Sequence, residues 1–271
     1  MDTDTQAGHR VEAEILTAGD VRLLVDGELA TVVLDRPTRR NAMTPSSWAA
    51  LAAVPDLLPA EVRVVLVRSE GPVFCAGIDL RMASPEGVPG EPSIAQIAKG
   101  SDTEIQVWIE TLQQAHTWLA DPRWITVAAV QGAAVGAGFQ LALGADIRVV
   151  ADDARFCMRE SALGLVPDLT GTGTLHRLVG YGRALDLCTT ARWVDAAEAD
   201  RLGLVNQLVP VAELPAAALE MCRSVLANST DAVRSIKELL LGAAGRDFAE
   251  QNRMERVLQV PLLRAMGTAI G

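Results

Sequence analysis

Short apolar runs occupy the first quarter of the chain, and their spacing predicts strands followed by a helix. Residues 21–25 and 29–35 flank Asp26-Gly27, a dipeptide typical of β-hairpin turns. Thr44-Pro45 offers a helix cap with proline at the first helical position. Residues 62–67 are continuously apolar apart from Arg63, which predicts a buried strand.

The rest of the chain alternates strands with helical periodicity. Prolines and glycines in residues 81–100 predict a long, mobile loop. Residues 102–119 repeat apolar positions every three or four residues, which predicts an amphipathic helix. Helical periodicity dominates after residue 180. These patterns predict an α/β fold with a disordered tail over 1–20, a core over 21–200 and a C-terminal helical subdomain over 201–271. The apolar stripe of the helix expected over 102–119 comprises Ile105, Trp108, Ile109, Leu112, His116 and Leu119. Three later strands are expected at 125–130, 146–151 and 155–158.

Residues 125–145 form an uncharged stretch of 21 residues, long enough to span a bilayer. However, the stretch contains Gln131 and Gln140, many small residues and few large apolar ones. A buried strand, a glycine turn and a buried helix explain it as well, and we expect that arrangement.

Composition narrows the function classes. A formal net charge of −10 argues against binding nucleic acid or an anionic membrane, because both need a positive footprint. The four cysteines are widely spaced and form no C-x-x-C pair, so we expect a reduced, cytoplasmic protein without a zinc site. The N-terminal residues show no secretory signal pattern.

Common catalytic motifs are missing from the sequence. It has no dinucleotide fingerprint, no Walker lysine, no G-x-S-x-G and no H-E-x-x-H. The three histidines have no ligand spacing, so no metal site is expected. His116 lies on the apolar face of the expected helix, where packing is a better interpretation than catalysis.

Two turns rich in small residues follow apolar strands. Residues 74–80 read FCAGIDL, and residues 130–140 read VQGAAVGAGFQ before a helix. Glycine and alanine allow a ligand close to the backbone, and the N–H groups at a helix N-terminus lack internal partners. Two such donors aimed at one point would form an oxyanion hole. The alternative is that both turns need glycine only for tight packing.

Four motifs in order resemble those of the crotonase (enoyl-CoA hydratase/isomerase) superfamily, over about residues 20–265. They are LDRP through NAM at 34–43, FCAGIDL at 74–80, the glycine-rich turn at 132–138, and F-x-x-x-E through GLVP at 156–167. The resemblance implies a crotonase-like spiral of ββα repeats, an acyl-CoA thioester substrate and a homo-trimer or hexamer. It implies no cofactor, since coenzyme A is part of the substrate.

The resemblance also implies roles for individual residues. The oxyanion donors would be the N–H groups of Ala76 and Ala137. Gly77, Ile78 and Asp79 would line the substrate together with Ala76. Arg39 and Arg40 would lie near the nucleotide end, although solvated surface arginines are an equal alternative.

Two positions that hold glutamates in hydratases of the family distinguish which member of the superfamily this chain resembles. Hydratases of the family use two glutamates, of which one matches Glu160 and the other falls on Gln140. Glutamine can orient a water but cannot accept or deliver a proton near neutral pH. Asp168 lies at the offset where dienoyl-CoA isomerases place an acid, although it could instead cap a helix. We therefore expect an enoyl-CoA isomerase or hydratase-like enzyme with Glu160 as acid/base, Asp168 as auxiliary acid and Gln140 at the substrate.

A non-catalytic acyl-CoA-binding relative is the competing hypothesis, and Gln140 is the residue that favours it. A serine peptidase on the related spiral fold lacks the necessary triad. We expect the C-terminal helices to form the oligomer interface, because they have more apolar surface than a short appendage can bury. Those apolar residues are Leu239 to Leu241, Val257, Leu258, Val260 and Leu262.

Overall fold

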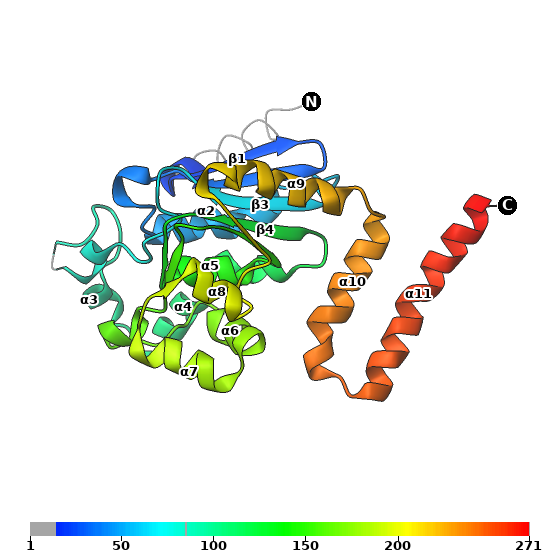
Figure 1. Ribbon diagram of the computed structural model, residues 1–271. Helices are drawn as coiled ribbons and strands as arrows, with labels where there is room; N and C mark the ends of the chain where they lie inside the picture. The colour runs from blue at the N-terminus through cyan, green and yellow to red at the C-terminus, as the bar shows by residue number, and fades with distance from the viewer. Residues whose placement is uncertain (1–14, 85, 271) are drawn as a thin grey trace, which may run out of the picture.

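The computed structural model describes residues 15–84 and 86–270 and is built around a six-stranded sheet (Figure 1). Its strand order is β1-β2-β3-β4-β6-β9. β1 (Val21–Asp26) and β2 (Leu29–Leu34) form the predicted antiparallel hairpin, with Gly27 at positive φ in the turn. The remaining strands join in parallel: β3 (Val64–Ser69), β4 (Ile125–Val130), β6 (Ile147–Ala151) and β9 (Gln207–Val209).

A second, three-stranded sheet of order β5-β7-β8 accompanies the first. After each of β3, β4 and β6, the chain forms a short extended segment that either belongs to this second sheet or forms a β-bridge to it. A helix follows each of these segments. These short segments are a bridge from Cys75 to Ala134, β5 (Ala133–Val135) and β7 (Arg155–Cys157). The helices that follow are α4 (Asp102–Thr117), α5 (Ala137–Gly144) and α6 (Gly171–Val179). The spiral of ββα repeats is therefore confirmed.

Alternation along the strands gives the main sheet two apolar faces. Val64 and Leu66 of β3 pack in one buried cluster with residues of α9 (Leu214–Leu226), whereas Val65 and Val67 belong to the larger core on the other face. Figure 1 shows α9 above the sheet and α4, α5 and α6 below it. The two faces of the sheet are thus covered by different parts of the chain.

Local signals set the helix boundaries on either side of the predicted loop. α2 (Pro45–Leu57) begins as predicted, with Thr44 as its cap and proline at the first position. The loop prediction for 81–100 is wrong in part, because η2 (Leu80–Ala83) and α3 (Ile94–Ile97) lie in or overlap this segment. Ser93 and Gln96 form a capping box that starts α3, a short-range signal that the count of prolines and glycines overlooked.

The predicted tail and the uncharged stretch have different outcomes. Of the tail, residues 1–14 lie outside the described residues, whereas residues 15–18 form a helical turn in which the N–H of Gly19 bonds the Ile15 carbonyl. Residues 125–145 form β4, β5 and α5, as expected. Among the described residues, no helix is both long and apolar enough to cross a membrane.

The end of the chain corrects the boundary predicted near residue 200. β9 pairs with β6 in the main sheet and α9 covers one of its faces, so both belong to the core. Among the described elements, α10 (Thr230–Gly242) and α11 (Phe248–Ile270) are the ones that extend from it, as a helical hairpin (Figure 1). The other elements between Pro37 and Gly245 are η1 (Pro37–Arg39), η3 (Trp118–Ala120), η4 (Glu160–Leu163), α7 (Tyr181–Thr190), β8 (Val194–Asp195), α8 (Ala196–Arg201), η5 (Val211–Glu213) and η6 (Ala243–Gly245).

A buried lysine holds this hairpin to the core. The Nζ of Lys237 on α10 donates to the carbonyls of Leu119 and Trp124 and to the carboxylate of Asp146, at 2.7–2.8 Å. The apolar side chains of Leu240 on α10 and of Val257 and Val260 on α11 are at least 45% exposed. Assembly through these helices stays a prediction.

Candidate active site

A cavity of about 480 Å³ lies between the two small-residue turns and α4. Its walls are mostly apolar, and Glu160 and Asp168 are its two carboxylates. The residues that line it are Trp48, Ala76, Gly77, Ile78, Leu80, Ile94, Ile97, Ala98, Ile105, Trp108, Ile109, Leu112, Val135, Gly136, Ala137, Arg159, Glu160, Leu163, Leu165, Asp168 and Leu169. An apolar pocket with a few convergent polar groups is the usual form of a small-molecule site.

The first turn presents a different donor from the one predicted. The N–H of Ala76 already bonds the carbonyl of Arg40 at 2.9 Å, so Ala76 does not fit the oxyanion role. Met43 bonds Gly77 and Asp79 on either side of Ile78, as in a parallel bridge. Such a bridge turns the N–H of Ile78 to the opposite side, and this group has no acceptor among the described residues. We therefore assign the first donor to Ile78.

Glycine at position 77 lets the two turns approach each other. Its φ is +86°, and an added Cβ would lie 2.7 Å from the carbonyl oxygen of Val135 and 3.8 Å from the nitrogen of Ala137. A side chain would therefore both strain the backbone and push the second turn away. The contact places the first turn directly against the start of α5.

The second turn has the backbone geometry that its predicted role requires. Ala137 is the first residue of α5, where its N–H has no partner within the helix and lies at the positive end of the helix dipole. Gly136 before it adopts φ +49°, ψ −117°, which a residue with a Cβ rarely adopts. Gly138 after it packs against Cys75, whose Cβ would lie 2.5 Å from an added one. Of these three positions, only the middle one combines an ordinary helical backbone with room for a Cβ, so alanine is tolerated there.

Glu160 lies at the start of η4 with its carboxyl group against the second turn. Its Oε1 would lie 3.2 Å from a Cβ added to Gly136, and this oxygen accepts a hydrogen bond from Nε2 of Gln140 at 2.6 Å. Its Oε2 is buried and has no hydrogen-bond partner among the described residues. Burial raises the pKa of Glu160, and the charge of Asp168 raises it further. A carboxyl with a raised pKa and one unbonded oxygen is suited to proton transfer.

Asp168 is half-buried in the loop before α6 and lines the same cavity. Burial raises its pKa as well. The capping alternative does not hold, because α6 begins at Gly171 after Thr170 and has no side-chain cap. The structure thus brings the two predicted acids to one cavity.

Gln140 does not line the cavity, contrary to the prediction that it contacts substrate. It is completely buried behind Glu160. Its Oε1 accepts hydrogen bonds from the N–H groups of Leu169 at 2.9 Å and Gly171 at 3.2 Å. These contacts, together with the bond to Glu160, direct the side chain toward the loop that precedes α6.

The remaining predicted binding residues lie outside the cavity. Arg39 and Arg40 are exposed, and the backbone of Arg40 supports the first turn by accepting from Ala76. The Asp79 carboxylate is paired with Arg81 and Arg36, and the hydrogen bond from Arg81 holds the pKa of Asp79 far below its usual range. Asp79 therefore acts as a buried anchor of the turn, and its side chain does not reach the cavity.

His116 packs as the sequence suggested. It is buried on α4, and burial lowers its pKa to about 4. Its Nδ1 lies 3.4 Å from the carbonyl oxygen of Leu112. The imidazole is therefore neutral at physiological pH and does not line the cavity.

Sequence reasoning missed the wall that faces the turns. Ile105, Trp108, Ile109 and Leu112 were predicted only as the apolar stripe of an amphipathic helix, and in the structure they line the cavity from α4. Their periodicity identified the face correctly. It could not distinguish a face packed on protein from a face that lines a ligand site, because both are apolar.

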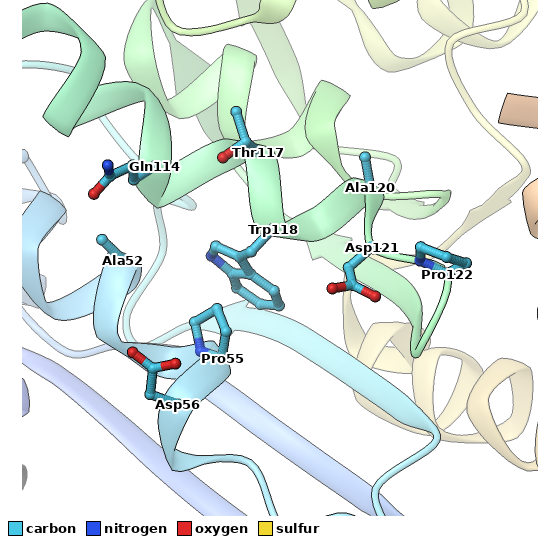
Figure 2. A pocket seen from close by; sticks show the side chains of 9 residues that line it. All are labelled: Ala52, Pro55, Asp56, Gln114, Thr117, Trp118, Ala120, Asp121 and Pro122. Atoms are coloured by element: carbon cyan, nitrogen blue, oxygen red, sulfur yellow. The ribbon is translucent and has the colours of Figure 1, made fainter. Parts of the chain in front are cut away.

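A second hollow of similar size lies between α2 and the α4–η3 segment (Figure 2). Its wall includes Trp118 with two acids, Asp56 and Asp121, and Asp121 is paired with Arg123. It shares no lining residue with the cavity around Glu160. Because the two cavities have similar volumes, volume does not distinguish them. The Glu160 cavity is chosen as the candidate active site because it contains the carboxyl groups with raised pKa values beside the two small-residue turns.

Comparison with known proteins shows which family the chain resembles. Residues 25–265 match the family model described as enoyl-CoA hydratase/isomerase. A Thermobifida fusca YX protein assigned as an enoyl-CoA hydratase, solved with acetoacetyl-CoA, is 46% identical, with a TM-score of 0.88 over 93% of this chain and 98% of that one. From Arabidopsis thaliana, a protein assigned as mitochondrial enoyl-CoA hydratase 2 is 31% identical over 88% of this chain and 75% of its own. The peroxisomal Δ(3,5)-Δ(2,4)-dienoyl-CoA isomerase of the same plant is 31% identical over 82% and 80%.

Proposed function

The chain belongs to the enoyl-CoA hydratase/isomerase family, and on that premise we propose that it moves a proton on an enoyl-CoA thioester through an enolate. The feature that supports this most is Glu160, a buried carboxyl with one unbonded oxygen beside the N-terminus of α5. The acetoacetyl-CoA complex of the Thermobifida fusca relative supports a thioester ligand.

The thioester carbonyl oxygen would accept hydrogen bonds from the N–H groups of Ile78 and Ala137. Both donors belong to the backbone and are fixed before substrate binds, so no reorganisation is needed when charge develops on the oxygen. Each such donor contributes roughly 3 kcal/mol to stabilising the enolate. The apolar walls strengthen this effect by keeping the local dielectric constant low.

Glu160 would move the proton between two carbons. With a 3-enoyl-CoA, Oε2 takes a proton from C2 and the carbonyl oxygen takes up negative charge as the enolate. The same oxygen then returns the proton to C4, and the double bond shifts from C3–C4 to C2–C3. The reaction balances without an oxidant, a reductant or a metal.

Isomerisation fits these residues better than hydration does. Hydration requires a base for the attacking water as well as an acid for C2. The position used by the second glutamate of family hydratases is Gln140, which cannot accept a proton and lies behind Glu160. Asp168 is the other acid in the cavity and would assist with substrates whose double bonds extend further along the chain.

The acyl group would lie along α4 on an apolar surface that includes Ile105, Trp108 and Ile109. This surface favours an apolar acyl chain over a charged one, because no ion partner for a distal carboxylate lines that wall of the described cavity. The carbonyl of Arg40 accepts a hydrogen bond from Ala76 of the first turn, and Arg39 and Arg40 are proposed to meet the nucleotide end.

The test is incubation with panels of 2-enoyl-, 3-enoyl- and dienoyl-CoA, followed by mass and chiral analysis of the products. We expect a shifted alkene of unchanged mass as the main product. A gain of 18 mass units as the main product would identify a hydratase. Thioester binding without any product would instead support the non-catalytic relative.

A further inference from the structure

Gln140 is joined by hydrogen bonds to two separate segments of the active site. Its Oε1 accepts from the N–H groups of Leu169 and Gly171, and its Nε2 donates to Oε1 of Glu160. Because two N–H donors need an oxygen as their acceptor, these contacts fix which end of the amide faces Glu160. The amide is completely buried, so water does not compete for these bonds.

This arrangement makes the two oxygens of Glu160 unequal. Oε1 is held by a short bond of 2.6 Å, whereas Oε2 has no hydrogen-bond partner among the described residues. A side chain held at one oxygen loses little further rotational freedom in the reaction. The proton-transfer atom is then Oε2.

The same bond opposes the effect of burial on Glu160. Burial and the nearby charge of Asp168 raise the pKa of Glu160, while the N–H from Gln140 lowers it by stabilising the ionised form. The other titratable groups that sense Glu160 are the thiols of Cys157 on β7 and Cys188 on α7, and Arg159 precedes it in the chain. A base has to be ionised before it can take a proton, so this neutral donor favours the working state.

We propose that Gln140 is a positioning residue that holds Oε1 of Glu160, leaves Oε2 free to move the substrate proton, and fixes Glu160 relative to the loop bearing Asp168. This inference rests on the proposed proton transfer by Glu160. It gives a role to the one position where the chain departs from the glutamate pair of family hydratases.

A purely structural role is the alternative, in which Gln140 only supports the loop through its oxygen. Two substitutions separate the possibilities. Gln140→Glu keeps an acceptor for Leu169 and Gly171 but, when ionised, has no donor for Glu160. Gln140→Met loses both and keeps a long, unbranched side chain. Gln131→Met is the matched control, because Gln131 is also a glutamine hydrogen-bonded to the backbone, donating to the carbonyls of Ser69 and Gly71, but it lies in the turn before β5 and does not line the cavity.

The experiment measures kcat, KM and the pH dependence of kcat/KM for each variant with the best substrate of the panel. We expect kcat at neutral pH to fall at least about tenfold in both Gln140 variants, with KM unchanged. The acidic limb of the profile should move to higher pH, furthest in Gln140→Glu, where two carboxyl groups repel each other. Gln131→Met should keep the wild-type limb.

A wild-type pH profile of kcat/KM in Gln140→Glu would overturn the proposal. It would mean that Gln140 only supports the loop before α6. Failure of Gln140→Met to fold does not affect this reading, since Gln140→Glu decides it. A second measurement needs no turnover: the infrared band of protonated Glu160, marked by its loss in Glu160→Gln, is titrated in wild type and in Gln140→Glu. If this band titrates at the same pH in both, the proposal is wrong. If it moves while wild type converts no substrate, only the proposed function fails.

Discussion

Replacing Glu160 by glutamine removes the proposed base and preserves the shape of the site. The new amide oxygen can still accept the N–H of Gln140, which now bonds Oε1 at 2.6 Å. Both proposed oxyanion donors are backbone groups and are unaffected. The substitution therefore isolates proton transfer from binding and folding.

The expected loss is large because the cavity has no other well-placed base. Asp168 lies in the loop before α6, whereas Glu160 lies against Gly136, next to the proposed oxyanion donor Ala137. General acid–base groups contribute about 10²–10⁴-fold, which corresponds to about 3–5 kcal/mol of activation free energy. We expect kcat for 3-enoyl-CoA isomerisation to fall by this factor, with thioester affinity retained.

The assay combines steady-state kinetics with calorimetric titration of a saturated acyl-CoA. Glu104→Gln serves as the control, because Glu104 is an exposed carboxylate that caps α4 outside the cavity. A Glu160→Gln variant that retains more than about a tenth of wild-type kcat would refute the assignment of the base. Loss of thioester affinity together with kcat would instead mean that Glu160 shapes the pocket.

Three further substitutions test other parts of the account. Asp168→Asn removes a charge that raises the pKa of Glu160, so the acidic limb of kcat/KM should move to lower pH; an unmoved limb would show that the two acids do not interact. Ala137→Pro places proline at the first position of α5, which helices tolerate, and removes the N–H, so kcat should fall by about 10²–10³-fold while circular dichroism stays native. Wild-type turnover in this variant would exclude Ala137 as a donor. Lys237→Met leaves two carbonyls and Asp146 without their buried partner and should lower the free energy of unfolding by roughly 3 kcal/mol, measured by urea denaturation; an unchanged midpoint would mean that α10 is held by other contacts.

Much of the fold was predictable because its signals are local. The hairpin around Gly27, the cap at Thr44 and strand β4 all depend on residues close in sequence. The boundary near residue 200 failed for the opposite reason. β9 pairs with β6 across more than fifty residues, and its three residues give no periodicity to detect.

The sequence identified segments that line the candidate cavity, but it did not identify which of their atoms face the cavity. The motif identified the first turn, yet the choice between Ala76 and Ile78 depends on which N–H the bridge to Met43 leaves unbonded. The resemblance predicted Gln140 at the substrate, but hydrogen bonds to Leu169 and Gly171 direct its side chain elsewhere. Such contacts join segments distant in sequence, so only the folded chain shows them.

The most direct test of the central claim follows hydrogen at C2 of a 3-enoyl-CoA in deuterium oxide. Enolate formation with Glu160 as base predicts that wild type incorporates deuterium into substrate or shifted product, detected by mass spectrometry and proton NMR. Glu160→Gln should lose this incorporation at least about a hundredfold while still binding the thioester. Incorporation at the wild-type rate in Glu160→Gln, or none in wild type that binds the thioester, would contradict proton transfer by Glu160 through an enolate.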